Sequence, residues 1–221
     1  MYAKYIKRPL DFMLSLIAII ILSPLLLIVA ILVRIKLGKP VIFKQQRPGK
    51  NEKIFTLYKF RTMTDKKDEN GNLLPDEQRL TKFGKALRST SLDELPELIN
   101  ILKGDMAIVG PRPQLIKDML FMTKEQRRRH EVRQGLTGLA QVNGRNNITW
   151  ENKFDYDLLY IDNISFLTDC KIILQTVGKV FRREDTVREG TESDMDLGDY
   201  LLKEKKITEE EYDKIIESLV K

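Results

Sequence analysis

The chain contains very few of the residues on which common catalytic and metal-binding sites depend. Its 221 residues include one cysteine, Cys170, and one histidine, His130. A single cysteine forms no disulfide within the chain, and one Cys with one His provides neither a zinc site nor a Ser-His or Cys-His pair of the usual kind. Any bound metal is therefore expected to be a hard cation on carboxylates. We place Cys170 in the core and His130, which follows three arginines, at the surface.

Charge is absent from a run of 22 residues between Asp11 and Arg34. A helix of that length spans about 33 Å, which is enough to cross the hydrocarbon core of a bilayer. The run is longer than the roughly 7–15 apolar residues of a signal peptide, and no small-x-small cleavage site follows it. A buried helix of a soluble protein usually has only about 10–14 apolar residues in a row. The run therefore predicts a membrane anchor.

Ser23 and Pro24 lie at the middle of the run. Proline removes a helical hydrogen bond and clashes with the preceding turn, so the helix bends there, and the serine hydroxyl can satisfy the freed carbonyl. Positive charge marks the cytoplasmic side of a membrane segment. Here it flanks both ends of the run, at Lys4, Lys7, Arg8, Arg34, Lys36, Lys39 and Lys44. We expect residues 1–40 to form a re-entrant hairpin broken at Ser23-Pro24; a straight span is the alternative.

The remaining charge is unevenly distributed. Residues 1–64 hold 12 Lys and Arg against 2 Asp and Glu, whereas residues 184–221 hold 6 against 13. The basic excess lies beside the predicted anchor, where anionic lipid attracts it. A nucleic-acid-binding protein would carry that charge on a folded recognition element with aromatic residues. We therefore expect a membrane partner and no nucleic acid.

The hydrophobic pattern predicts an α/β core of mainly helices over residues 41–183, followed by an acidic linker and a short helical hairpin within 184–221. Expected strands cover 41–43 and 54–58, and a turn-rich loop covers 65–79. Glycines predict a second loop from Gly135 to Arg145. Expected helices cover 79–88, 91–102, 114–131, 150–161, 166–182, 197–206 and 209–219.

Two adjacent acids, Asp93 and Glu94, allow two interpretations. In one, Ser91 caps a helix and Glu94 completes a capping box, so the acids are structural. In the other they are catalytic, because nearby cations, among them Arg112 in a stiff Gly-Pro-Arg-Pro turn, suit phosphate oxygens. Acids with arginines and no histidine indicate phosphoryl chemistry, with a carboxylate nucleophile and a hard metal. The cations in question are Lys59, Arg61, Arg88 and Arg112.

The sequence resembles a known family. The run from Ser91 to Pro113 closely resembles the bacterial sugar transferases, which are monotopic phosphoglycosyl transferases. Further resemblances are the Arg-Pro-Gly turn at 47–49, residues 58–63, the glycine-rich stretch 135–145, and Asp157-x-x-Tyr160 with Asp169. The match covers about residues 1–182. Gln134 and Glu97 depart from it, since the family commonly has proline and glutamine there.

The resemblance implies transfer of a phosphosugar from a UDP-sugar to polyprenol (undecaprenyl) phosphate, with release of UMP. The reaction would take place at the cytoplasmic face of the bacterial inner membrane. Asp93 would be the nucleophile and would bind Mg²⁺, and Glu94 would assist, for example by accepting a proton. Lys59, Arg88, Arg112 and Arg145 would bind the substrate phosphates. The identity of the sugar, a homodimeric state and the role of the tail stay open.

Two other functions remain open from the sequence. A non-catalytic, membrane-tethered scaffold would use Asp93-Glu94 as a cap and would bind through the tail hairpin, but it has no need of arginines near a carboxylate pair. A membrane-anchored nucleotide-sugar hydrolase would share the site and use water as the acceptor.

Overall fold

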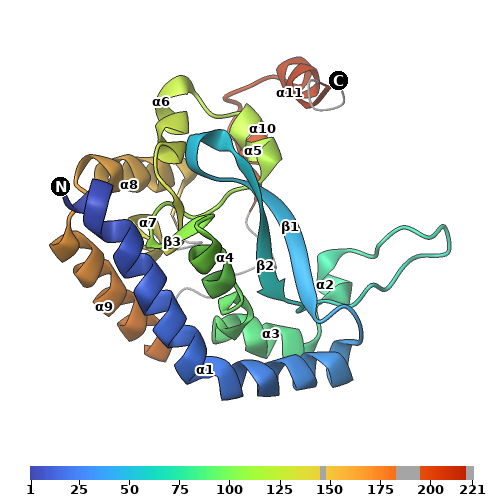
Figure 1. Cartoon of the computed structure of the whole chain (residues 1–221). Coiled ribbons are helices and arrows are strands. Elements are labelled where there is room, and N and C mark those ends of the chain that lie inside the picture. The colour runs from blue at the N-terminus through green and yellow to red at the C-terminus, as the bar shows by residue number, and fades with distance from the viewer. Residues whose placement is uncertain (145–147, 183–194, 218–221) are drawn as a thin grey trace.

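The computed structural model describes residues 1–144, 148–182 and 195–217 of the chain. Short helices surround two small sheets, and a long helix runs along one side (Figure 1). The strands are β1 (Ile42–Pro48), β2 (Ile54–Phe60), β3 (Met106–Val109) and β4 (Gln134–Thr137). The α-helices are α1 (Lys7–Leu37), α2 (Asp76–Arg79), α3 (Lys82–Ser89), α4 (Glu97–Lys103), α5 (Ile116–Leu120), α6 (Lys124–Arg127), α7 (Leu139–Val142), α8 (Trp150–Asp162), α9 (Phe166–Arg182), α10 (Leu197–Lys203) and α11 (Glu209–Glu217).

The predicted anchor is helix α1, and it changes direction part of the way along its length (Figure 1). Pro24 lies inside the helix and has no N–H for the Ile20 carbonyl four residues earlier. The Ser23 hydroxyl donates to that carbonyl at 2.9 Å, as the sequence predicts. The helix stays continuous through the bend and does not break at Ser23-Pro24.

One side of α1 packs on the core and the other is exposed. Val29 and Val33 are buried in a cluster with Phe60 of β2 and Leu87 of α3. The segment Tyr2–Leu37 is long and apolar enough to cross a membrane, and an 18-residue stretch within it has a mean hydropathy of 3.3. The exposed apolar residues include Ile17, Ile20, Ile21, Leu27, Ile28, Ile31, Leu32 and Ile35. A continuous exposed apolar face of this kind is typical of a surface that contacts lipid.

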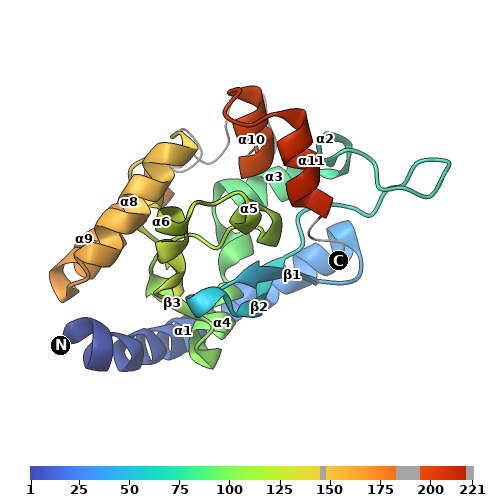
Figure 2. The same ribbon diagram turned by 90° about the horizontal axis from the view of Figure 1, so that it is seen from above.

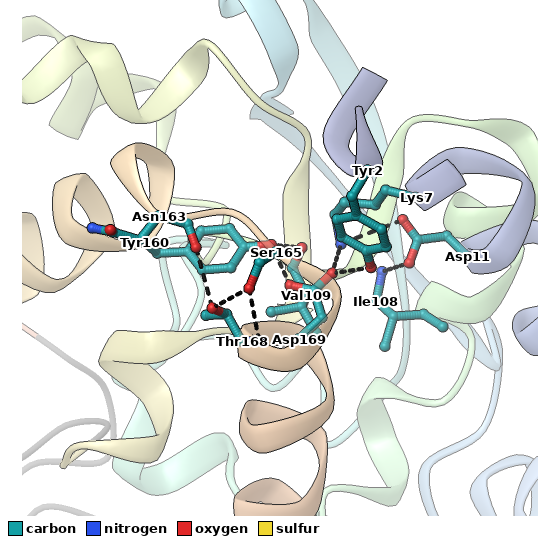
Figure 3. Close-up of polar contacts among 10 residues, drawn as sticks. All are labelled: Tyr2, Lys7, Asp11, Ile108, Val109, Tyr160, Asn163, Ser165, Thr168 and Asp169. Atoms are coloured by element: carbon teal, nitrogen blue, oxygen red, sulfur yellow. Dashed lines mark hydrogen bonds and ion pairs between the residues drawn. The ribbon is translucent and has the colours of Figure 1, made fainter. Parts of the chain in front are cut away.

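A buried polar network fastens the start of α1 to the core (Figure 3). Asp169 of α9 accepts hydrogen bonds from the Tyr2 hydroxyl at 2.7 Å, the Lys7 ammonium at 2.6 Å and the Tyr160 hydroxyl at 2.8 Å. Tyr160 also contacts the Val109 carbonyl of β3 at 3.0 Å. The Asp169 carboxylate therefore joins α1, α8 and α9, and its role is structural.

The two sheets differ in how well the sequence predicts them. Strands β1 and β2 form an antiparallel hairpin, with Ile42 opposite Phe60 and Pro48 opposite Ile54, and β1 extends beyond the predicted 41–43 to Pro48. Strands β3 and β4 pair in parallel. The prediction of a loop beginning at Gly135 is wrong at that residue, because Gly135 lies within β4. A Cβ there would collide with the Gly110 nitrogen, so glycine at 135 allows the backbone to lie close to that of Gly110.

The predicted helix over 114–131 is in fact three short elements: α5, α6 and a 3₁₀ turn, Arg128–His130. The surface assignment of His130 is wrong, since only 2% of the residue is exposed. Burial, reinforced by the charge of Arg129, lowers the pKa of His130 to about 3, so its ring is neutral. Arg129 is buried because its guanidinium pairs with Asp157, with N–O distances of 2.7 and 2.9 Å. Cys170 is only partly buried.

Helices α10 and α11 form the predicted C-terminal hairpin. A capping box begins α11: Thr208 N–H donates to Glu211 at 2.8 Å, and Glu211 N–H donates to the Thr208 hydroxyl at 3.2 Å. The hairpin lies on the opposite side of the molecule from α1 (Figure 2). The chain is thus a mainly helical α/β protein with an apolar helix at one side and a helical hairpin at the other.

Candidate active site

Asp93 and Glu94 face a cavity of about 600 Å³ between the β1–β2 hairpin, α4, α8 and the start of α10. A cavity of this size suits a small organic ligand. Its lining carries several charged residues of both signs: Arg47, Lys59, Arg61, Arg88, Asp93, Glu94, Glu97, Arg112, Lys153, Asp157 and Asp196.

The capping interpretation of Ser91 and Glu94 is wrong. Ser91 has the left-handed backbone angle φ of 56°, and its side chain makes no capping hydrogen bond. The predicted helix over 91–102 is a 3₁₀ turn, Leu92–Glu94, followed by α4, which begins after Pro96. A non-glycine residue with positive φ is uncommon and is a feature of strained, functional turns. This turn directs Asp93 and Glu94 into the cavity.

Glu94 holds two of the predicted cations. Its Oε1 atom accepts a hydrogen bond from Lys59 Nζ at 2.7 Å and from Arg112 Nη2 at 2.8 Å. Burial would raise the pKa of Glu94, but the charges of Arg112 and Lys59 outweigh burial and hold that pKa well below its usual range. A carboxylate held ionised by two cations is suited to positioning them and is a weak proton acceptor.

Asp93 is in a different environment, although it is the next residue. Only 8% of it is exposed. Burial, and after it the negative charge of Glu94, raises the pKa of Asp93 to about 6, while Lys59, Arg88 and Arg112 act in the opposite direction. A raised pKa means a more basic and more nucleophilic carboxylate, and at neutral pH most of it is ionised.

The structure brings three of the four predicted phosphate-binding residues to the cavity. Lys59, Arg88 and Arg112 all line it. Arg88 Nε also contacts the Thr62 hydroxyl at 3.1 Å. Arg112 is oriented through its carbonyl, which accepts a hydrogen bond of 2.7 Å from buried Arg129. Arg145 lies outside the described residues.

Sequence reasoning missed Arg47. This arginine belongs to the Arg-Pro-Gly motif, and in the structure it lies in β1. Its side chain lines the cavity, as do those of Phe43 and Gln45 on the same face of the strand. Burial lowers its pKa to about 10, so it stays cationic at neutral pH. The alternation of side chains along β1 was the available signal, because residues two apart on a strand share a face.

The carboxylates at the cavity can be compared with the ligands that the expected Mg²⁺ requires. Among residues 1–144, 148–182 and 195–217, no group of three or more His, Cys, Asp or Glu side chains could enclose a metal ion. Mg²⁺ usually keeps several waters and binds through one or two carboxylates together with substrate phosphates. Asp93 fits that mode. It is a carboxylate at the cavity, and among the described residues it forms no ion pair, whereas Glu94 forms one with Lys59 and one with Arg112.

Glu97, at the start of α4, is a third carboxylate in the cluster. It lies 3.2 Å from Lys59 and is 3% exposed. Burial raises its pKa to about 7, an effect that Lys59 and Arg112 reduce and Glu94 increases. At neutral pH it is therefore partly protonated, and a protonated carboxyl, like a glutamine amide, carries no charge.

We expect Glu97→Gln to stabilise the protein at high pH. The folded state retains a proton on Glu97 that the unfolded chain releases near its ordinary pKa of 4.5. Wild-type stability therefore falls as pH rises from about 4.5 through about 7. At pH 8 the variant should be more stable by about 3 kcal/mol, a rise in Tm of about 6–12 °C.

Thermal unfolding at pH 5 and pH 8, in detergent, measures this effect. Glu77→Gln, at an exposed position, is the matched control and should leave the difference between the two pH values as in the wild type. If the difference in Tm between pH 5 and pH 8 were the same in Glu97→Gln and in the wild type, Glu97 would be ionised at both pH values.

Comparison with known proteins gives the same family as the sequence motifs. The family model described as bacterial sugar transferase matches residues 2–183. A Bacillus subtilis (strain 168) protein named "Uncharacterized sugar transferase EpsL" is 53% identical over 179 residues, which is 81% of this chain and 89% of that protein.

Two more distant relatives have names that state a reaction. A Klebsiella pneumoniae UDP-glucose:undecaprenyl-phosphate glucose-1-phosphate transferase is 42% identical over 79% of this chain and 40% of its own length. An Aeromonas hydrophila UDP-N-acetylgalactosamine-undecaprenyl-phosphate N-acetylgalactosaminephosphotransferase is 36% identical over 78% of this chain and 43% of its own length. This chain therefore spans less than half of the length of those two enzymes. Together with the match over residues 2–183, these similarities show that the chain belongs to the bacterial sugar transferase family.

Proposed function

We propose that this protein transfers a phosphosugar from a UDP-sugar to polyprenol phosphate through a covalent intermediate on Asp93. The observation that carries the proposal is a buried, basic carboxylate at a cavity that also holds Lys59, Arg88 and Arg112. Names of the relatives support the class of donor and acceptor.

In the first step an Asp93 carboxylate oxygen attacks the phosphorus that carries the sugar. The bond from that phosphorus to the bridging oxygen breaks, and UMP leaves with the bridging oxygen and the electron pair. A carboxylate attacks a diphosphate only if the phosphate charge is neutralised. Arg88 and Arg112 are placed to do so, and Mg²⁺, when bound at Asp93, supplies further positive charge to the diphosphate.

In the second step a phosphate oxygen of the polyprenol phosphate attacks the same phosphorus. The bond between phosphorus and the Asp93 oxygen breaks, which restores the carboxylate and gives the polyprenyl-diphosphate sugar. We assign Glu94 the task of holding Arg112 and Lys59 toward the phosphates, because its own charge is committed to those two cations. This differs from the expectation that Glu94 accepts a proton.

We further propose that α1 enters the membrane from the cytoplasmic face and returns to it. The bend at Pro24, the basic residues on both sides of the apolar run and the exposed apolar face support this course. Phe166, Leu167 and Leu174 form a second exposed apolar patch on α9, and the Tyr2 and Phe166 rings are 5.9 Å apart. Both features suit a protein whose lipid substrate has its phosphate at the interface.

We expect both ends of α1 to be cytoplasmic. Cysteines introduced at Lys4 and Lys39, one at a time with Cys170 replaced by serine, should resist an impermeant external thiol reagent in intact cells. Pro24→Ala restores the missing hydrogen bond and removes the clash, so it should shift part of the population to a straight span with one end labelled. Labelling of one end in the protein with Pro24 intact would contradict the re-entrant course.

Release of UMP measures the proposed reaction and separates it from the two alternatives. A phosphoglycosyl transferase should sustain turnover of a UDP-sugar only when polyprenol phosphate is present. A hydrolase should sustain it without the lipid, and a scaffold should release no UMP from any UDP-sugar. The charged cavity argues against the scaffold, because titratable groups with shifted pKa values gathered at a cavity are characteristic of a functional site.

A further inference from the structure

We propose that the C-terminal hairpin, residues 195–217, forms the wall of the cavity that contacts the sugar of the donor, with Asp196 as a sugar-binding residue. The inference rests on the proposed function, since it takes the donor to be a UDP-sugar. Met195 and Asp196 line the same cavity as Asp93, beside Trp150 and Lys153 of α8. The two residues that lead into α10 are therefore part of the site.

The position of the hairpin indicates which substrate it faces. Helices α10 and α11 lie on the opposite side of the molecule from α1, with the body of the core between them (Figure 2). A polyprenol phosphate reaches the cavity from the side of the membrane helix. A nucleotide sugar is soluble in water and enters from the other side. A wall on the side away from α1 thus faces the donor.

One buried carboxylate fixes this wall to the rest of the cavity. Asp118 of α5, which is 2% exposed, accepts a hydrogen bond from the Leu197 N–H at 2.9 Å. Its second oxygen accepts one from the Leu115 N–H at 3.0 Å, and Leu115 also lines the cavity. The Trp150 indole donates to the Met195 carbonyl at 3.1 Å. These contacts hold the backbone of residues 195–197 in place at the edge of the site.

Hydrophobic packing holds the rest of the hairpin. Leu197 is buried with Phe121 and Trp150, and the rings of Phe121 and Tyr212 stack with centroids 5.3 Å apart. A Cβ at Gly198 would lie only 2.6 Å from a Phe121 ring carbon, so the hairpin approaches α5 as closely as glycine permits. Close packing of this kind makes the wall a preorganised surface.

The chemistry of the wall suits a sugar. A carboxylate accepts hydrogen bonds from neighbouring hydroxyl groups, and Asp196 also forms an ion pair with Lys117. The family match ends at residue 183, before the hairpin, while Asp93 and the cations lie inside it. The phosphate chemistry thus lies within the shared segment, and the hairpin can vary with the sugar. The names of the Klebsiella and Aeromonas relatives share undecaprenyl phosphate and differ in the sugar.

The test uses the full-length protein in detergent and the variant Asp196→Asn. UDP-glucose, UDP-galactose and UDP-N-acetylgalactosamine are the donors, and UMP release is the readout. For the donor that the wild type uses best, the KM should rise about tenfold, because a hydroxyl loses a charged partner, while the KM for polyprenol phosphate should stay within about twofold.

Two control variants separate sugar contact from structural support. Asp213→Asn removes one exposed acidic charge from the same hairpin and should behave as the wild type. Lys117→Met removes the ion pair to Asp196 but keeps the carboxylate, so it should raise the donor KM less than Asp196→Asn does. Equal effects of Asp196→Asn and Lys117→Met, or a rise in the lipid KM instead, would overturn the proposal.

A binding measurement keeps this test independent of turnover. Trp150 is the single tryptophan of the chain and lies where the hairpin meets the cavity, so its fluorescence should report donor binding. Asp196→Asn should weaken binding of the UDP-sugar about tenfold and leave binding of UDP unchanged. Binding without UMP release would refute the proposed function alone, whereas equal weakening of UDP and UDP-sugar would refute the sugar wall alone. A wild type that binds no UDP-sugar would overturn both.

Discussion

Asp93→Asn should reduce UMP release by at least about 10³-fold and leave the protein folded. The amide is nearly the same size as the carboxylate but is not a nucleophile toward phosphorus, so the covalent step is lost. Asparagine is also tolerated at the start of a helical turn. Replacing a buried carboxylate whose pKa is raised to about 6 by a neutral group removes a charge that burial disfavours, so Tm should not fall.

Intact-protein mass spectrometry tests the covalent step directly. Wild type incubated with UDP-sugar alone and quenched should carry one phosphosugar, and Asp93→Asn should carry none. Asp155→Asn, at an exposed position on α8, is the matched control and should form the adduct. An Asp93→Asn enzyme with most of its activity would remove Asp93 from the mechanism, and an active wild type that never carries the adduct would favour direct transfer between the two substrates.

Local signals in the sequence predict much of the fold. The uncharged run with Pro24 at its middle predicts α1 and its bend, because both depend on neighbouring residues alone. Thr208 and Glu211 predict the start of α11 for the same reason. Predictions fail where tertiary contacts decide the outcome. Arg129 and His130 belong to a charged stretch, yet they are buried, since Asp157, 28 residues away, pairs with Arg129.

The candidate site shows the same division. Motifs and residue chemistry single out Asp93, Glu94, Lys59, Arg88 and Arg112, and the structure gathers all five at one cavity. Local rules nevertheless misassign the backbone there. Ser91 and Glu94 have the spacing of a capping box, but the Glu94 carboxylate pairs with two cations from distant segments instead. A charge-assisted pair is stronger than a capping hydrogen bond. The hairpin wall at Met195 and Asp196 had no sequence signal, since only the packing on α5 places it at the cavity.

The second large effect is expected at Arg112. Its side chain is partly exposed at the cavity and contacts Glu94, while its backbone is held between Pro111 and Pro113 and by the hydrogen bond from Arg129. Arg112→Lys keeps the positive charge and the backbone, but a lysine ammonium cannot form the two parallel hydrogen bonds that a guanidinium makes to phosphate oxygens. Loss of this interaction with the developing phosphate charge is worth about 2–4 kcal/mol, so kcat/KM should fall by about 30- to 1,000-fold.

Arg128→Ala is the control for Arg112→Lys. Arg128 pairs with Glu125 and Asp162 at the surface, where ion pairs contribute little, so its loss should change kcat/KM by no more than about twofold. Far-UV circular dichroism and Tm of both variants should match the wild type, which separates catalysis from folding. If Arg112→Lys retained full activity alongside Arg128→Ala, Arg112 would be a surface charge that serves Glu94 only. The phosphates would then have to be bound by Arg47 and Arg88, which line the same cavity.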